Sequence, residues 1–228
     1  APSWTQFPKK CRGISPSLER IDLTFKNVIN QHEDPPAKIL ATFSTDDTIE
    51  IQIQEGKGLF AVARKKNGGV ISSQKEARNY ELPHVNILPQ IGPLQKDERA
   101  LDEDYVKSAV YSSLASRHFR NQLSYLHKHY KKFKALTESS WENFRIISLT
   151  KAEKKFEVTD PYLLVQEGLF ATEIGEMGHG LQMWLQTIWF LSRANPEGAV
   201  VLDEPDVYMH ADLQRKLIRI VKNIFKQV

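Results

Sequence analysis

Two adjacent carboxylates follow an apolar run near the end of this 228-residue chain. Residues 199–202 (Ala-Val-Val-Leu) lead into Asp203 and Glu204, and Pro205 comes next. Such a run is typical of a central strand covered on both faces, and ligands of open α/β sheets bind at the carboxyl ends of such strands. There, Asp203 could orient a magnesium ion that bridges nucleotide phosphates, and Glu204 could polarise the attacking water. A strand that ends in a solvated acidic turn would show the same residues.

A glycine-containing turn precedes these carboxylates in the sequence. Gly178, His179 and Gly180 stand just before an apolar segment, residues 181–192, that is predicted to be a helix. Two glycines at i and i+2 leave backbone N–H groups free to approach an anion, and the helix dipole adds positive potential at the same end. Gly-His-Gly alone is also an ordinary tight turn. The order of glycine turn, helix, turn, apolar strand and acid pair is more specific, and it predicts half of a nucleotide site.

This order of elements resembles the ATPase heads of ABC type. Residues 177–182 resemble the signature motif, and residues 200–205 resemble the Walker B motif. The resemblance implies an α/β fold: a partial, ABC-ATPase-like P-loop NTPase head with an antiparallel β region and a helical insertion.

The residues after the acid pair narrow the resemblance to the soluble ATPases of the RecF, SMC and OLD groups. In those groups the acid pair continues as Asp-Glu-Pro-acidic-x-x-Leu-His-Pro-x-x-Gln. Within residues 203–214 of this chain, His210 and Gln214 match that run. Met209 replaces the usual leucine and Ala211 replaces the usual proline.

The resemblance also implies roles for individual residues. Asp203 would be the metal ligand and Glu204 the catalytic residue. The other site residues would be nucleotide contacts across a dimer (Gly178, His179, Gly180 and Gln182) and members of the D-loop (Met209 and His210). ATP and Mg²⁺ would be the cofactors, sandwiched between the two heads of a homodimer. Hydrolysis would drive or gate a nuclease or another effector subunit, or act on DNA, including in antiviral defence systems.

Three features depart from that family pattern. No phosphate loop of the form Gly-x-x-x-x-Gly-Lys-Ser/Thr occurs in the 228 residues, because Gly56-Lys57-Gly58 lacks the spacing and does not open a helix. The signature serine is unmatched, and the switch histidine would lie beyond Val228. Since the chain begins at Ala1 and stops within an amphipathic helical pattern, we interpret it as a piece of a longer protein whose phosphate loop precedes Ala1.

Two alternative functions remain open. If the phosphate loop is naturally absent, the chain is a non-catalytic ABC-fold binding or assembly module. The other alternative is a transporter ATPase subunit. The long helical block and the run around His210 argue against that alternative.

The chain reads as one truncated domain in three parts. We expect a β-rich part of the ATPase lobe in residues 1–92, a helical insertion in 93–143, and a lobe with the signature and Walker B motifs in 144–228. Period-two alternation in residues 48–54 is a clear strand signal. The other predicted strands are 21–28, 37–43, 58–63, 85–89, 144–149, 158–166 and 169–173. One long apolar stripe from Val106 to Phe133 predicts one helix or two helices in sequence, and residues 211–228 predict a final helix.

Composition limits the class of protein. Apolar residues make up 41% and charged residues 26%, as in a soluble domain with a real core. No apolar run approaches the ~20 residues of a membrane span, and no signal peptide is seen. Cys11 is the single cysteine, which excludes an internal disulfide and favours the cytoplasm. The net charge of +3 is too small to argue for nucleic acid. The basic run 127–134 could contact phosphates or be a solvated helix face.

Overall fold

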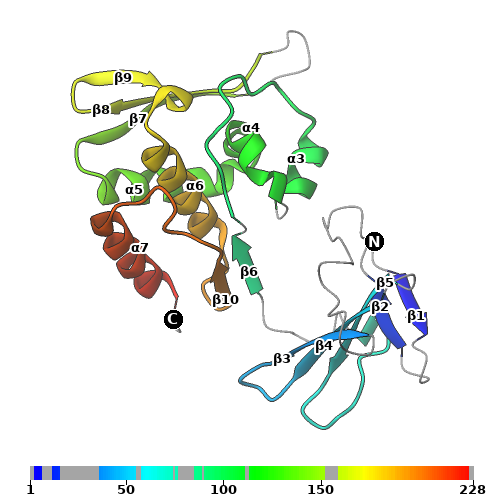
Figure 1. The fold of residues 1–228 in the computed structure, drawn as a ribbon. Helices are drawn as coiled ribbons and strands as arrows, with labels where there is room; N and C mark the ends of the chain where they lie inside the picture. The colour runs from blue at the N-terminus through cyan, green and yellow to red at the C-terminus, as the bar shows by residue number, and fades with distance from the viewer. Residues whose placement is uncertain are drawn as a thin grey trace. The chain divides into compact units, whose positions relative to one another are not determined.

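The computed structural model describes most of the chain, and its elements carry the labels of Figure 1. The described residues are 3–6, 12–15, 36–54, 58–73, 75–76, 85–88, 90–110, 113–151 and 159–225. The chain falls into two compact units, Ala1–Pro83 and His84–Val228, and each is described by itself. The predicted part boundaries after residues 92 and 143 stay predictions.

The first unit contains a five-stranded sheet in the order β1-β2-β5-β4-β3 (Figure 1). Its strands are β1 (Ser3–Gln6), β2 (Arg12–Ser15), β3 (Ala37–Thr42), β4 (Thr48–Gln54) and β5 (Gly58–Arg64). All of these neighbours pair antiparallel, which confirms the predicted antiparallel β region. The alternating pattern of residues 48–54 correctly predicted β4. The strand predicted at 21–28 lies outside the described residues.

The second unit contains two sheets and most of the helices. A parallel pair joins β6 (Val85–Leu88) to β10 (Ala199–Leu202). A three-stranded antiparallel sheet has the order β7-β8-β9, with β7 (Phe144–Thr150), β8 (Tyr162–Glu167) and β9 (Phe170–Glu173). The α-helices are α3 (Glu103–Ala109), α4 (Phe119–Tyr125), α5 (Tyr130–Ser140), α6 (His179–Arg193) and α7 (Ala211–Ile224). The 3₁₀ turns are η2 (Ser113–His118), η3 (His127–His129) and η4 (Ile174–Glu176).

The predicted helical stripe is helical but more broken than expected. Three α-helices separated by 3₁₀ turns replace the one or two helices predicted between Val106 and Phe133. The breaks fall at His118 (φ −135°, ψ 43°) and Leu126 (φ −98°, ψ 38°), whose backbone angles are not helical. Buried polar contacts accompany the first break, since Gln122 Nε2 donates to the carbonyl of Ala115 at 2.6 Å. A side-chain hydrogen bond to the backbone of the same segment thus competes with the helical periodicity.

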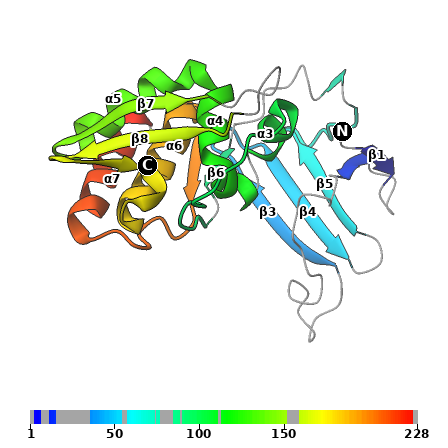
Figure 2. The ribbon, with the colours of Figure 1, turned by 90° about the horizontal axis from the view of Figure 1, so that it is seen from above.

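The core of the second unit is built around α6. All residues from Leu181 to Ser192 are buried, including the polar residues Gln182, Gln186, Thr187 and Ser192, so this helix is covered on every side. Figures 1 and 2 show α6 passing beneath the β7-β8-β9 sheet toward β10, with α5 and α7 beside it. Large side chains such as Trp184, Trp189 and Phe133 are at most 2% exposed. None of the described helices has both the length and the apolar character that a membrane crossing requires.

The prediction that residues 199–202 form a strand covered on both faces is wrong for the described residues. Val200 and Leu202 pack against the core, but Val201 is 48% exposed. Its register partner Ile87 on β6 is 56% exposed. Because alternate residues of a strand face opposite sides, one face of the β6-β10 pair lies on the core and the other is open. The continuous apolar sequence of residues 199–202 did not distinguish a strand covered on both faces from a strand covered on one face.

Candidate nucleotide site

The acid pair lies at the carboxyl end of the parallel β6-β10 pair. The Asp203 N–H donates to the carbonyl of Leu88 at 3.0 Å, so the ladder continues one residue beyond β10. This pairing places the residues after β6 beside those after β10. Gln90 Nε2 donates to Glu204 Oε2 at 2.6 Å. The carboxyl ends of two adjacent strands therefore bring an amide and a carboxylate into contact.

Gln90 was missed in the sequence, although a signal was present. It is the first polar side chain after the short apolar run of β6, as Asp203 is after β10. Parallel strands end at the same edge of a sheet, where ligands bind. Pairing residues 85–88 with 199–202 would have brought Gln90 next to the acids. The pairing itself could not be read from either segment alone.

The backbone at the acid pair is unusual. Glu204 has φ 44° and Tyr208 has φ 63°, both in the left-handed region that non-glycine residues rarely adopt. Two turn hydrogen bonds stabilise the path, from Val207 N to the Glu204 carbonyl at 3.3 Å and from Met209 N to the Asp206 carbonyl at 2.9 Å. Such conformations cost on the order of 1–3 kcal/mol each and cluster at functional sites.

The two carboxylates are accessible to a ligand. Asp203 and Glu204 are both exposed. No group of three or more His, Cys, Asp or Glu residues within the described parts of the chain could hold a metal ion by itself. Mg²⁺ is commonly held by one or two carboxylates together with substrate phosphates. The donor set at Asp203 fits an ion of that kind, shared with a nucleotide.

The glycine turn forms the open start of α6. Gly178 is the N-cap residue, and no side chain caps the helix. The first intrahelical bonds run from the N–H groups of Leu181 and Gln182 to the Gly178 carbonyl. Gly178 and His179 are exposed. An uncapped helix start that faces solvent is a ready site for a phosphate oxygen.

The loop after the acid pair returns to this helix start. Figure 1 shows it running from β10 past α6 to the beginning of α7. The Tyr208 ring packs edge-to-face on His179, with centroids 5.7 Å apart. A Cβ atom at Gly180 would lie 2.9 Å from the Tyr208 carbonyl oxygen, so the close approach requires glycine. The structure thereby brings the signature-like turn and the D-loop-like residues together.

The two D-loop residues differ in exposure. Met209 is 6% exposed and belongs to the core. His210 is exposed and is the N-cap residue of α7. Gln214 Nε2 donates to the Met209 carbonyl at 3.0 Å, so the glutamine that matched the family run fixes the end of this loop.

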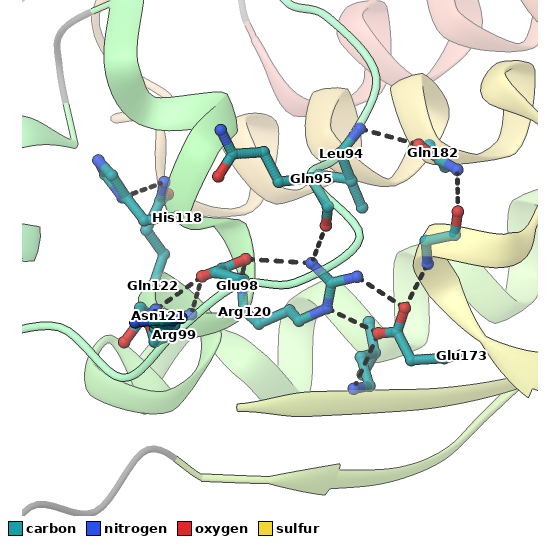
Figure 3. Close-up of polar contacts among 12 residues, drawn as sticks. Leu94, Gln95, Glu98, Arg99, His118, Arg120, Asn121, Gln122, Glu173 and Gln182 are labelled. Atoms are coloured by element: carbon teal, nitrogen blue, oxygen red, sulfur yellow. Dashed lines mark hydrogen bonds and ion pairs between the residues drawn. The ribbon is translucent and has the colours of Figure 1, made fainter. Parts of the chain in front are cut away.

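Gln182 is occupied by its own chain. Gln182 is only 2% exposed, and its Oε1 accepts a hydrogen bond from Leu94 N at 2.8 Å. Its Nε2 donates to the carbonyls of Gly175 at 3.1 Å and Met177 at 2.7 Å. Figure 3 shows the contact with Leu94. The structure therefore gives Gln182 a role in shaping the turn, and its predicted contact with nucleotide stays a prediction.

The parallel strand pair with acids at its carboxyl end, preceded along the chain by the uncapped start of α6, fits an AAA/ABC-like ATPase domain of P-loop NTPase type. Residues 77–227 match the family model described as "AAA domain, putative AbiEii toxin, Type IV TA system". The match covers more than half of the 228 residues, and the chain belongs to this family. Domains of this type use ATP and Mg²⁺. A search of curated proteins found no match.

Proposed function

We propose that this chain is most of the ATP-hydrolysing head of a soluble ATPase of the RecF, SMC and OLD-like group. Asp203 would hold the Mg²⁺ that accompanies the nucleotide, and Glu204 would polarise the attacking water. Gln90 orients Glu204 through the 2.6 Å hydrogen bond between them. This contact between the ends of two parallel strands is the observation that carries the proposal.

The site is proposed to be completed by a second copy of the chain. No side chain caps the start of α6, and the exposed His179 packs on Tyr208 rather than on the acid pair. Among the described residues, the side chain of Glu204 is hydrogen-bonded to Gln90 and not to residues 178–182. A homodimer that sandwiches ATP would use Gly178, His179 and Gly180 of one copy on the nucleotide held by the other.

The hydrolysis cycle is proposed to control an effector in the cytoplasm. The family description names an AbiEii toxin and a type IV toxin–antitoxin system. That description, together with the likeness to DNA-associated ATPases, favours a defence role in which the ATPase gates a nuclease or acts on DNA. This step rests on family analogy.

A non-catalytic binding or assembly module is the second candidate. The absence of a Gly-x-x-x-x-Gly-Lys-Ser/Thr motif from the 228 residues favours it. In that case the fold would bind a partner without turnover, and the acid pair would be a remnant of a nucleotide site.

Replacement of Glu204 by glutamine in the full-length protein separates these candidates. Glu204→Gln keeps the shape and the contact with Gln90 but removes the base, so ATP binding should persist while turnover falls by about a hundredfold or more. Binding by calorimetry and phosphate release measure the two quantities. Glu197→Gln, at an exposed glutamate in the turn before β10, is the matched control and should behave as wild type. Wild-type protein that shows no ATP turnover would favour the binding module.

A further inference from the structure

A buried ion network lies in the second unit, apart from the acid pair. Arg120 of α4 has a side chain only 1% exposed. Its Nε and Nη2 atoms donate to the two carboxylate oxygens of Glu173 at 2.6 Å each (Figure 3). Its Nη1 donates to the Gln95 carbonyl at 2.9 Å and to Glu98 Oε2 at 3.2 Å. One guanidinium thus joins α4, the end of β9 and the segment 95–98.

Glu98 closes the network on the side of α4. Its carboxylate accepts the backbone N–H groups of Arg120 at 2.9 Å and Asn121 at 2.8 Å. It also accepts Asn121 Nδ2 at 2.8 Å. A charge this deeply buried is stable only when its partners are in place. The geometry of the guanidinium is therefore fixed from both sides.

Glu173 carries the network into the glycine turn. It is the N-cap residue of η4, and its carboxylate accepts the Gly175 N–H. A Cβ atom at Gly175 would lie 2.8 Å from Arg120 Nη2 and 2.9 Å from Glu173 Oε2, so the turn packs directly on the ion pair. Gln182 then binds the carbonyls of Gly175 and Met177. Residues 174–177, which the network holds, lead directly into the N-cap Gly178.

The segment 90–98 connects the same network to the acid pair. At one end Gln90 contacts Glu204. In the middle, the Gly92 carbonyl accepts from Gln186 Nε2 at 2.9 Å, and Leu94 N donates to Gln182. At the other end the Gln95 carbonyl and Glu98 bind Arg120. The segment is therefore tied to the acid pair, to α6 and to the ion network.

We infer that Arg120 is a positioning residue: its contacts with Glu173, Gln95 and Glu98 set the place of the turn Gly178–Gly180 relative to Gln90 and Glu204. A bidentate arginine–carboxylate pair fixes orientation as well as distance. The Gln95 carbonyl and Glu98 also accept hydrogen bonds from Nη1, which further restricts the orientation of the guanidinium. The inference rests on the proposed function: the turn and the acid pair of one chain would serve the two ATP sites of the dimer, and a fixed spacing between them would keep both sites in register.

Arg120→Lys in the full-length protein is the first test. Lysine keeps the charge but loses the planar, two-pronged contact. A cavity of about 340 Å³ is bordered by Arg120, Glu98 and Glu173, so the lysine side chain can change its position and water can enter beside it. Misplacement of the turn should lower kcat for ATP by about tenfold to a hundredfold while KM changes much less, since the turn acts on the reacting phosphate rather than on initial binding.

Gly175→Ala is the second variant, because it displaces the ion pair without removing a charge. Hydrogen exchange measured on peptides covering residues 174–180 should be faster in both variants, while exchange in α5 stays as in wild type. Phe133→Leu, a core truncation in α5 at a residue 0% exposed, is the control for general loss of stability. It should leave kcat and exchange at 174–180 near wild type.

The outcomes separate this inference from the proposed function. Wild-type kcat and wild-type exchange in both Arg120→Lys and Gly175→Ala, in a protein whose turnover depends on Glu204, would overturn the positioning role alone. An equal fall of kcat in Phe133→Leu would overturn it as well, because general instability would then suffice. Unchanged turnover in Glu204→Gln would overturn the proposed function, and the exchange data would still report whether Arg120 holds the turn.

Discussion

The residues of this site are of two kinds: exposed side chains that could act on a ligand, and buried side chains whose hydrogen bonds hold them in place. Glu204 presents a solvent-accessible carboxylate from a left-handed backbone position. Gln90 reaches it from the neighbouring strand, and Gln182 holds the glycine turn from inside. The acids and the glycines could be proposed from their types and order in the sequence. Gln90 could not, because its relevance depends on a strand pairing across more than a hundred residues of chain.

Gln90→Ala should lower ATP turnover of the full-length protein without unfolding it. Gln90 is exposed, so the free energy of unfolding should stay within about 0.5 kcal/mol of wild type. Glu204 would lose the group that orients it, and kcat should fall by about tenfold or more. Gln166→Ala, which removes an exposed hydrogen bond to the Gly168 carbonyl, is the control. Equal turnover in the two variants would remove Gln90 from the site.

His118 should make stability depend on pH. It is 1% exposed, its Nε2 has no hydrogen-bond partner among the described residues, and burial lowers its pKa. Its stabilising contribution is therefore complete above the unfolded pKa of about 6.5 and is lost as the pH falls below it, because the unfolded chain then binds more protons. The free energy of unfolding should decrease by up to about 1.4 kcal/mol per pH unit from this residue.

His118→Asn keeps an acceptor near the Nδ1 contact with Gln122 and removes the titration. Urea unfolding at pH 7 and pH 5 measures the change. The pKa of His129 is also lowered by burial, so part of the pH dependence should remain in the variant. A variant with the full wild-type slope would show that His118 does not contribute.

Regular elements followed their sequence patterns, and the breaks between them did not. Strand β4 and helix α6 appear where alternation and an apolar run predicted them. The stripe from Val106 to Phe133 is divided by 3₁₀ turns, since buried polar side chains such as Gln122 compete with the helix. The open face of β10 was also missed, because local sequence does not report which neighbours cover a strand.

The contact between α6 and the loop before α7 predicts different costs for two glycines in one turn. Gly180→Ala should destabilise the protein by about 1–3 kcal/mol, because its Cβ would meet the Tyr208 carbonyl at 2.9 Å. Gly178→Ala should change the stability by less than about 1 kcal/mol, since nothing lies within 4 Å of its Cβ position and the loss of a preferred N-cap residue is offset by the lower conformational entropy of the unfolded chain. Thermal unfolding distinguishes them. Equal melting temperatures would show that the loop does not pack on α6 in solution.

At the scale of the whole molecule, the proposed ATP site is shared between two copies of the chain. Each copy would contribute its acid pair to one site and its glycine turn to the other. The family places the chain among ATPase domains. The proposed site needs the acid pair of one copy and the helix start of the other. A monomeric enzyme would need both sets to act within one chain.

Subunit mixing tests that claim most directly. Gly178→Asp should fold, because aspartate is a favoured N-cap residue, and should abolish turnover by repelling phosphate from the start of α6. Glu204→Gln should be inactive for lack of the base. When the two inactive full-length variants are mixed in equal amounts, half of randomly assorted dimers contain one site with neither change, so about a quarter of wild-type ATP turnover should return. A mixture as inactive as its components would contradict a site shared between two copies.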